Sequence, residues 1–385
     1  MAQTWPVSRT RRAALRIVDL LGRAAFAPFR QRRRKLDPAQ VQRILVIEPW
    51  NIGDVVLATP LLAELRVRFP RARISLLAKS YARELLDGSG LVDELIDCDL
   101  PWTAQKNKYR FTPPVLREMR DLVVSLRERR FDVVLDARMD IRANVLAALS
   151  GARHRVGYDI GGGGWLLTET LPSISDSTHR IDDWLSLLPL LDADASSPKG
   201  VSERTRQPKL IVGEAERAAA RTRLEAMTGG AGPTIGYHPG GSHPGKRWPV
   251  QHFSELAKEL SRTIGGRHVV FRGPEDETPG GWPDEVTIVR PSLRELMALM
   301  TQCDVIVCND SGPMHIADAL GVPVVAIFEV GNPKWFGPSG TRATVVAGEL
   351  AGTGMSAAPL DRPPANPVPV GRVASAVREA LSSTR

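Results

Sequence analysis

A carboxylate stands where an apolar strand gives way to a helix early in the chain. Residues 43–47 (RILVI) are apolar and rich in β-branched side chains, and Asn51-Ile52-Gly53-Asp54 follows them. Gly53 permits a tight strand-to-helix turn, which places Asp54 at the helix start, facing the ligand side of the sheet. Asp54 is therefore a candidate catalytic group, although Asp is also a common helix cap. The turn is not a GxGxxG loop, which disfavours a dinucleotide site there.

A second candidate site combines small residues with a lysine. The run 238–242 (HPGGS) ends an apolar strand, and 246–249 (KRWP) precedes the next helix. Exposed backbone N–H groups beside Lys246 predict an anion site suited to a phosphate. The alternative is a glycine-rich loop that carries a solvated Lys-Arg pair.

The most specific motif is the segment 309–315 (NDSGPMH), which follows an apolar strand and opens a helix. Ser311 and Gly312 present N–H groups at the positive end of that helix, where a diphosphate would bind. Asp310 either caps the helix or holds a ribose or sugar hydroxyl. His315 lies in the first turn, near the same point, and is either a ligand contact or a core histidine.

Glu275 follows another apolar strand, in the segment 271–277 (FRGPEDE). A carboxylate there is placed to accept hydrogen bonds from a ribose or an amine. The alternative is a solvated acidic turn.

These candidates require a scaffold of strands that end at one edge. Apolar strands are predicted at 43–47, 73–77, 92–96, 132–135, 234–237, 268–271, 305–308 and 324–328. Helices are predicted at 54–69, from 81, at 115–129, 250–263, 293–301, 313–320 and 371–382. Continuous apolar strands between helices predict parallel sheets covered on both faces. A polar stretch near 191–208 reads as a linker, so two α/β halves are expected to leave a ligand cleft between them.

The net positive charge of the chain comes from its first 38 residues. The chain has 51 Lys and Arg against 43 Asp and Glu, but residues 39–385 are balanced, which disfavours nucleic-acid binding. Residues 8–27 form an amphipathic helical pattern that Pro28 ends, and a basic cluster follows up to Lys35. We therefore predict that residues 8–35 contact an anionic membrane surface. The alternatives are a helix packed on the protein itself and a disordered tail.

Sequence composition limits the cellular compartments in which the protein is expected. No apolar run approaches the ~20 residues of a membrane-spanning helix, and no secretory signal is recognisable. Cys98, Cys303 and Cys308 form no CxxC pair, so buried free thiols in a reducing compartment are expected. A cytoplasmic protein on the inner face of a bacterial membrane fits these features.

Three motifs together resemble glycosyltransferase family 9, the lipopolysaccharide heptosyltransferase family. They are 43–62 (RILVIEPWNIGDVVLATPLL), 237–253 (YHPGGSHPGKRWPVQHF) and 308–328 (CNDSGPMHIADALGVPVVAIF). The resemblance implies a GT-B fold of two Rossmann-like, doubly wound domains facing a cleft. It also implies an ADP-heptose donor, a glycolipid acceptor, inversion at the anomeric carbon, and no cofactor or required metal. The expected domains are a basic extension (1–38), an acceptor-side domain (39–198) and a nucleotide-sugar domain (199–385).

Roles carry over only where residues match the motifs. Asp54 resembles the family's catalytic base and Lys246 its phosphate-contacting lysine. Six residues match donor-binding positions, namely Ser242, Glu275, Asp310, Ser311, Gly312 and His315. Arg138 and Arg142, which follow the strand at 132–135, are expected to meet an anionic glycolipid acceptor.

Two residues differ from the family's usual pattern, and other functions are still possible from the sequence. Glu48 stands where relatives often carry a basic residue, and Glu329 replaces a small residue. These positions bear on the donor sugar and the acceptor more than on the fold. The alternatives are transfer from another nucleotide sugar, a nucleotide-sugar epimerase of the same fold, and a non-catalytic scaffold that kept the fold. An NAD-dependent dehydrogenase is disfavoured because no dinucleotide motif follows the first strand.

Overall fold

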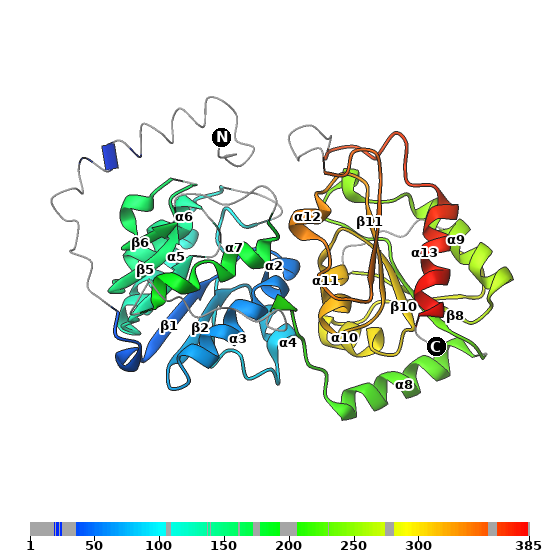
Figure 1. Ribbon diagram of the computed structural model, residues 1–385, viewed down its shortest axis with the longest axis horizontal. Helices are drawn as coiled ribbons and strands as arrows, with labels where there is room; N and C mark the ends of the chain where they lie inside the picture. The colour runs from blue at the N-terminus through cyan, green and yellow to red at the C-terminus, as the bar shows by residue number, and fades with distance from the viewer. Residues whose placement is uncertain are drawn as a thin grey trace. The chain divides into compact units, whose positions relative to one another are not determined.

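The computed structural model divides the chain into two compact units, Met1–Arg206 and Gln207–Arg385 (Figure 1). It describes residues 19, 21, 22, 24, 36–104, 109–136, 138, 140–160, 162–171, 178–192, 206–229, 231–273, 281–352 and 360–383. The predicted boundary at 198/199 lies outside the described residues.

The first unit is built on a six-stranded parallel sheet. Its strands are β1 (Arg43–Ile47), β2 (Arg73–Ala78), β3 (Glu94–Asp97), β4 (Val133–Asp136), β5 (His154–Tyr158) and β6 (Glu169–Leu171). They lie in the order β3-β2-β1-β4-β5-β6. The register pairs Ile47 of β1 with Leu77 of β2 on one side and with Asp136 of β4 on the other. The strand order therefore reverses between β1 and β4, which is where ligands bind in open α/β sheets.

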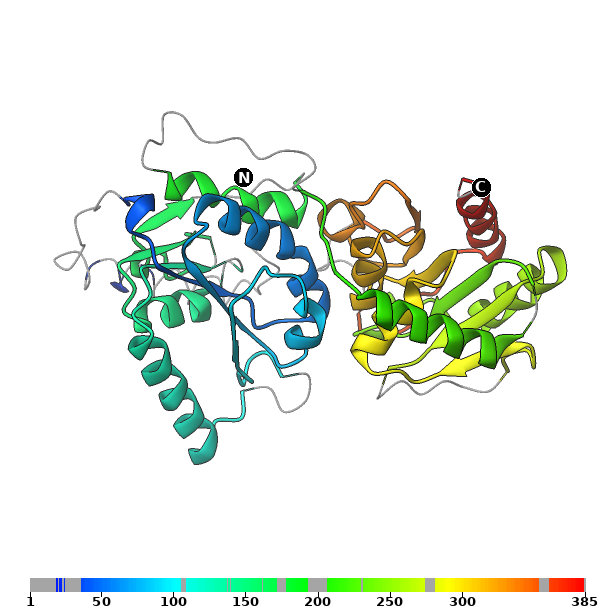
Figure 2. The ribbon, with the colours of Figure 1, turned by 90° about the horizontal axis from the view of Figure 1, so that it is seen from below.

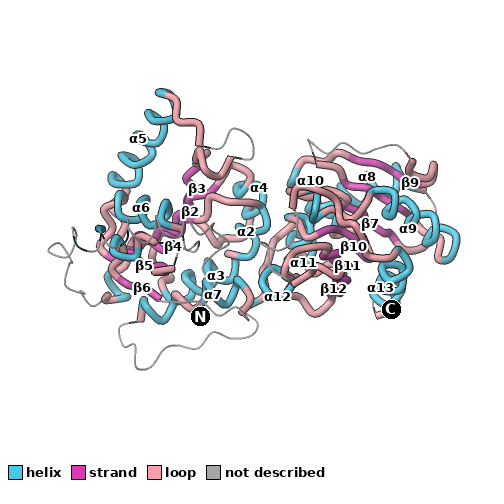
Figure 3. The backbone as a smooth tube through the Cα atoms, turned by 90° about the horizontal axis from the view of Figure 1, so that it is seen from above, coloured by secondary structure: helices cyan, strands magenta, loops and turns pink. Residues whose placement is uncertain are grey.

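Helices cover both faces of this sheet (Figure 3). They are α2 (Ile52–Leu57), α3 (Thr59–Arg68), α4 (Ala82–Leu86), α5 (Pro113–Glu128), α6 (Ile141–Leu149) and α7 (Arg180–Leu185), with short 3-10 turns such as η3 (Gly164–Leu166). The helix predicted at 54–69 is wrong as one element, because the chain bends at Ala58 between α2 and α3. Pro60 lies at the second position of α3, where a residue without an N–H group is tolerated.

The second unit repeats the plan. Its strands are β7 (Thr234–His238), β8 (Arg267–Phe271), β9 (Val286–Val289), β10 (Val305–Asn309), β11 (Val324–Phe328) and β12 (Ala343–Ala347). Its helices are α8 (Glu214–Thr228), α9 (Val250–Thr263), α10 (Leu293–Met300), α11 (Gly312–Ala319), α12 (Pro333–Phe336) and α13 (Val370–Ser382). The order β12-β11-β10-β7-β8-β9 reverses between β7 and β10, so each unit has one such reversal point.

Each sheet is sealed by an apolar layer. In the second unit Tyr237, Trp248 and Phe253 are fully buried among aliphatic residues of the strands and of α9 and α13. In the first unit Leu126 of α5 and Leu146 of α6 pack on Leu45 and other strand residues. The predicted free, buried thiols are confirmed at Cys98, Cys303 and Cys308, and burial raises the pKa of each.

Candidate functional site

At the reversal point of the first sheet, a carboxylate and a guanidinium come together from neighbouring loops. Asp54 lies in the first turn of α2, after β1, and Arg138 lies in the loop after β4. Arg138 Nη1 donates to Asp54 Oδ1 at 2.6 Å, and the Asn51 backbone N–H donates to Asp54 Oδ2 at 3.1 Å. The Asp54 side chain is 12% exposed. The sequence therefore places Asp54 at a ligand edge, and the tertiary contact fixes its orientation.

Two further carboxylates lie close to Arg138. Glu48 is fully buried, with Oε1 3.8 Å from Arg138 Nε, and Asp136 Oδ1 accepts the Arg138 backbone N–H at 2.8 Å. Burial raises the pKa of Glu48 well above its usual range and raises the pKa of Asp136 to about 7. Burial by itself would lower the pKa of Arg138, but Asp54 and Glu48 outweigh it. The Arg138 guanidinium thus contacts Asp54, the most exposed of the three carboxylates, while burial favours protonation of Glu48 and Asp136.

The raised pKa of Asp136 predicts a pH-dependent stability. Between the unfolded value near 3.8 and the folded value of about 7, the folded chain binds a proton that the unfolded chain does not. As the pH rises through this window, protonation of Asp136 should therefore make the free energy of unfolding fall by about 1.4 kcal/mol per pH unit. Asp136→Asn should remove that slope, as measured by urea unfolding of the full chain at several values inside the window, roughly pH 5 to pH 7.

The control for this measurement is Asp87→Asn, which changes an exposed carboxylate and should give a curve parallel to that of the wild type. If the Asp136→Asn and wild-type curves also run parallel, Asp136 is ionised in the folded chain throughout the range and the assignment is wrong.

Aromatic rings form a wall beside this pair. The guanidinium of Arg138 lies 5.0 Å from the centre of the Trp50 ring. Arg142, in the first turn of α6, lies 5.5 Å from Trp50, 5.6 Å from Trp102 and 5.9 Å from Tyr109. Such distances allow cation–π attraction. None of these three aromatic residues was predicted from the sequence to belong to a site. For Trp50, its place in the loop directly after β1 was an available signal.

Both arginines predicted to meet the acceptor therefore share one wall, but each has a carboxylate partner. Arg142 Nε donates to Asp140 Oδ1 at 2.8 Å, and Nη1 donates to the Tyr109 hydroxyl at 3.0 Å. The Arg138 side chain is 11% exposed and bound to Asp54, whereas that of Arg142 is 30% exposed. Arg142 is the more accessible of the two for an anionic group.

The second unit has an equivalent ion pair at its own reversal point. Lys246 lies in the short 3-10 turn η6 (Pro244–Lys246) in the loop after β7, and Asp310 directly follows β10. Lys246 Nζ lies 2.6 Å from Asp310 Oδ2, and Asp310 is 6% exposed. In each unit, an ion pair thus joins the loops that follow the two strands at which the order reverses.

Asn309, the last residue of β10, holds the Lys246 loop in place. Its Nδ2 donates to the carbonyls of Pro239 and Gly240 at 2.8 and 3.1 Å, and its Oδ1 accepts the Trp248 backbone N–H at 3.0 Å. Asn309 is fully buried. We assigned it no role from the sequence, because its partners lie about 60 to 70 residues away.

The structure places the predicted donor-binding residues in different positions. Ser311 is the N-cap residue of α11, and Gly312 begins that helix, so both lie at its positive end. His315 is buried in the first turn of α11, and Ser242 is exposed in the loop after β7. Glu275 lies outside the described residues. The structure thus brings Lys246, Asp310, Ser311 and Gly312 to one edge, and the roles of all these residues stay predictions.

Glu329, the second departure, has a structural partner. It is 2% exposed, and its Oε1 accepts the Val368 backbone N–H at 2.8 Å. Burial raises the pKa of this carboxyl. Glu329 therefore ties the end of β11 to the segment that leads into α13.

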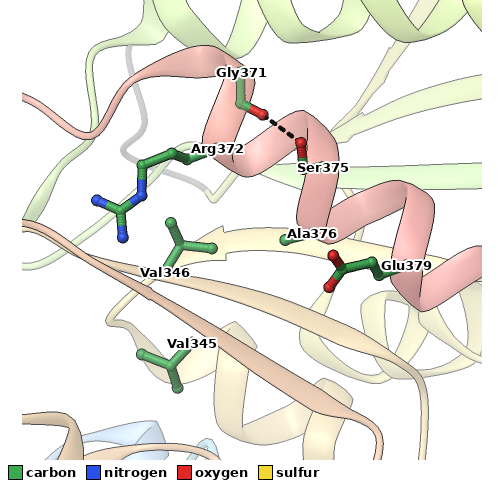
Figure 4. Close-up of a pocket in the computed structure, with 7 residues that line it drawn as sticks. All are labelled: Val345, Val346, Gly371, Arg372, Ser375, Ala376 and Glu379. Atoms are coloured by element: carbon green, nitrogen blue, oxygen red, sulfur yellow. Dashed lines mark hydrogen bonds between the residues drawn. The ribbon is translucent and has the colours of Figure 1, made fainter.

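A surface pocket in the second unit contains none of the predicted site residues (Figure 4). It lies between β12 and α13. Its lining residues are Val345, Val346, Gly371, Arg372, Ser375, Ala376 and Glu379. We assign it no role in the chemistry of Asp54 or Lys246.

Most of the predicted basic segment 8–35 lies outside the described residues. Its described residues Asp19 and Gly22 contact the loop and 3-10 turn near Gly163 and Trp165. The Gly163 backbone N–H donates to Asp19 Oδ1 at 2.7 Å. A Cβ at Gly22 would lie 2.2 Å from Trp165 Cε2, so only glycine fits there. Leu21, beside this contact, is 63% exposed. Among the described residues, no helix has the length and apolar character needed to cross a membrane.

Two Rossmann-like units, each built on a parallel sheet with one reversal point, make up the GT-B fold of glycosyltransferases. The solved structure of Escherichia coli ADP-heptose lipopolysaccharide heptosyltransferase II has this fold, with a TM-score of 0.70 and 24% identity over 89% of this chain and 99% of that one. The model of glycosyltransferase family 9 (heptosyltransferase) matches residues 119–354. The chain therefore belongs to glycosyltransferase family 9.

Curated relatives agree with this assignment. The chain is 28% identical over 319 residues to lipopolysaccharide heptosyltransferase 2 of Salmonella typhimurium, covering 79% of this chain and 87% of that protein. It is 26% identical over 317 residues to lipooligosaccharide heptosyltransferase 2 of Haemophilus influenzae, covering 79% of this chain and 88% of that protein.

Among the described residues, no group of three or more His, Cys, Asp or Glu side chains is arranged to hold a metal ion.

Proposed function

We propose that this chain is an inverting heptosyltransferase that moves heptose from ADP-heptose to a lipopolysaccharide-core glycolipid. The observation that carries the proposal is the pair of ionic contacts at the two reversal points, Asp54–Arg138 and Lys246–Asp310. One supplies an oriented carboxylate, and the other supplies a cation near the start of α11. The names of the relatives supply the sugar and the acceptor class.

The donor half of the reaction needs an anion site. Lys246 and the backbone N–H groups at the start of α11 are placed to neutralise the diphosphate of ADP as it leaves. Asp310 holds Lys246 in the free protein and would exchange that contact for a sugar or ribose hydroxyl when the donor binds. Glu275 and Ser242 complete the proposed donor contacts. In this scheme the electrostatic work is done by the protein's own groups without a required metal.

The acceptor half needs a base. Asp54 takes the proton of the acceptor hydroxyl as that oxygen attacks the anomeric carbon. The bond from this carbon to the phosphate oxygen breaks, and ADP leaves with the electron pair. Attack from the face opposite ADP inverts the anomeric configuration. Arg138 orients the Asp54 carboxylate through its 2.6 Å contact, so we assign it to positioning, while Arg142 and the Trp50 ring contact the acceptor.

The acceptor class places the reaction at a membrane. We propose that the protein is cytoplasmic and peripheral on the inner face of the bacterial cytoplasmic membrane, with residues 8–35 on anionic lipid. The ten Lys and Arg of residues 1–38 against two Asp support this, because basic segments are attracted to anionic lipid surfaces. The epimerase alternative is not favoured, since the named relatives are heptosyltransferases.

The donor is tested first by thermal unfolding with ADP, UDP, GDP, CMP and NAD. A ligand at a hundred times its dissociation constant adds about 2.7 kcal/mol to the free energy of unfolding, which moves the midpoint by several degrees. Selective stabilisation by ADP is expected. Selective stabilisation by UDP or GDP would replace the donor and keep the mechanism, and no response to any nucleotide would contradict donor binding.

A further inference from the structure

The outer face of α5 exposes large apolar side chains among cations. Phe111, just before the helix, is 50% exposed, Leu116 is 52% exposed and Val124 is 47% exposed. Arg117 and Arg120 lie between the last two and are also exposed. These five residues are called the α5 outer face. Exposed apolar side chains gathered on one element mark an interaction surface.

The opposite side of α5 is already used. Met119, Leu122 and Val123 pack against the core of the first unit, and Leu126 is fully buried there. At about 100° per residue, Leu116, Arg120, Val124 and Arg117 fall in an arc of about 100° that begins beside Val123, at the edge of the buried face. Two apolar stripes on one helix therefore serve two purposes, and the fold explains only the inner one.

Charge in this part of the chain is one-sided. Residues 104–130 contain eight Lys or Arg against three Asp or Glu, although residues 39–385 as a whole are balanced. The three acidic residues of α5 are Glu118, Asp121 and Glu128, and only Asp121 pairs with a residue of the outer face, through Arg120 at 2.9 Å. The helix α5 itself carries three Arg and three acidic residues, so the excess of cations lies at its start, where residues 104–117 contain four Lys or Arg and no Asp or Glu. An excess of cations beside the exposed Phe111 and Leu116 matches an anionic lipid surface rather than an acidic peptide groove.

The segment that leads into α5 contacts Arg142. Tyr109, two residues before Phe111, accepts a hydrogen bond from Arg142, which shares the Trp50 ring with Arg138. Figures 2 and 3 show the start of α5 projecting from the first unit. A lipid bound at this projecting end would have its headgroup next to Arg142 and the aromatic rings around it.

We propose that the α5 outer face docks on an anionic phospholipid bilayer. Phe111 and Leu116 enter the headgroup region, and Arg117 and Arg120 contact lipid phosphates. This surface is separate from residues 8–35, and it lets a bilayer-anchored acceptor reach Arg142 without leaving the membrane. The lipid-docking step goes beyond the proposed function, and its test does not depend on catalysis.

The test measures co-sedimentation of the full chain with vesicles of phosphatidylcholine, alone or mixed with phosphatidylglycerol. The wild type should bind the mixed vesicles, and more weakly at high salt. Phe111→Ser/Leu116→Ser and Arg117→Gln/Arg120→Gln should each weaken binding by about tenfold. Matched controls are Val67→Ser, which changes a 74% exposed apolar residue on α3, and Arg221→Gln, which changes an exposed cation on α8.

The outcomes separate the possible occupants. Equal vesicle binding by wild type and both double variants overturns the proposal, because residues 8–35 then account for all binding. A wild type that self-associates, with variants that become monomeric and keep their vesicle binding, also overturns it and assigns the face to a second copy. Unchanged thermal midpoints confirm folding of the variants, and because the assay contains no donor or acceptor, failure of the proposed function would not affect it.

Discussion

Replacing Asp54 by asparagine should slow sugar transfer by about a thousandfold while ADP binding stays unchanged. Asparagine keeps the shape of the side chain and an oxygen for the Asn51 N–H, so the start of α2 is preserved. It removes the negative charge that would accept the acceptor's proton. The measurements are kcat and KM for both substrates, with ADP affinity by calorimetry, on wild type and variant.

A matched control comes from Asp37, which caps the short 3-10 turn η2 (Pro38–Gln40) just before β1, away from the carboxyl edge of the sheet. Asp37→Asn removes a capping carboxylate of the same kind and should leave kcat unchanged. The base assignment fails if Asp54→Asn turns over normally. It also fails if Asp54→Asn loses ADP binding in proportion to activity, because the residue would then act through folding.

Replacing Lys246 by methionine should lower ADP affinity and slow transfer by about a hundredfold or more. Methionine keeps much of the length of the lysine side chain and removes the charge that faces the diphosphate. The single change also leaves Asp310, which is 6% exposed, without its 2.6 Å partner. An unpaired buried carboxylate is itself destabilising, so the single variant does not separate binding from folding.

The double variant Lys246→Met/Asp310→Asn separates them, since it removes both charges together. If Lys246 serves only to pair with Asp310, the double variant should recover stability and ADP affinity together. If Lys246 binds the diphosphate, the double variant should recover thermal stability and still bind ADP more weakly than Asp310→Asn alone, which controls for the proposed contact of Asp310 with the donor. Recovery of full ADP affinity would therefore contradict the proposed role of Lys246.

The regular elements followed from local sequence. The helix at 250–263 and the strand at 324–328 have the predicted bounds, because a helical apolar stripe and a continuous apolar run are local signals. Four strands, β5, β6, β9 and β12, were not predicted. Each contains residues that are only partly buried or exposed, so none forms a continuous buried apolar run. The helices α6, α7, α8 and α12 were also not predicted. In α8 only Ala220 and Leu224 are buried, so its apolar stripe is narrow.

The candidate site divides in the same way. Local sequence was enough to predict the α/β class, the parallel strands, and the polar loops that follow β1, β7 and β10, since each depends on residues close together in the chain. The pairing of Asp54 with Arg138 across 84 residues and of Lys246 with Asp310 across 64 came from the folded chain. So did the burial of Glu48 near Arg138. These contacts depend on which strands are neighbours in the sheet, and long-range strand order is not encoded in any local pattern of residues.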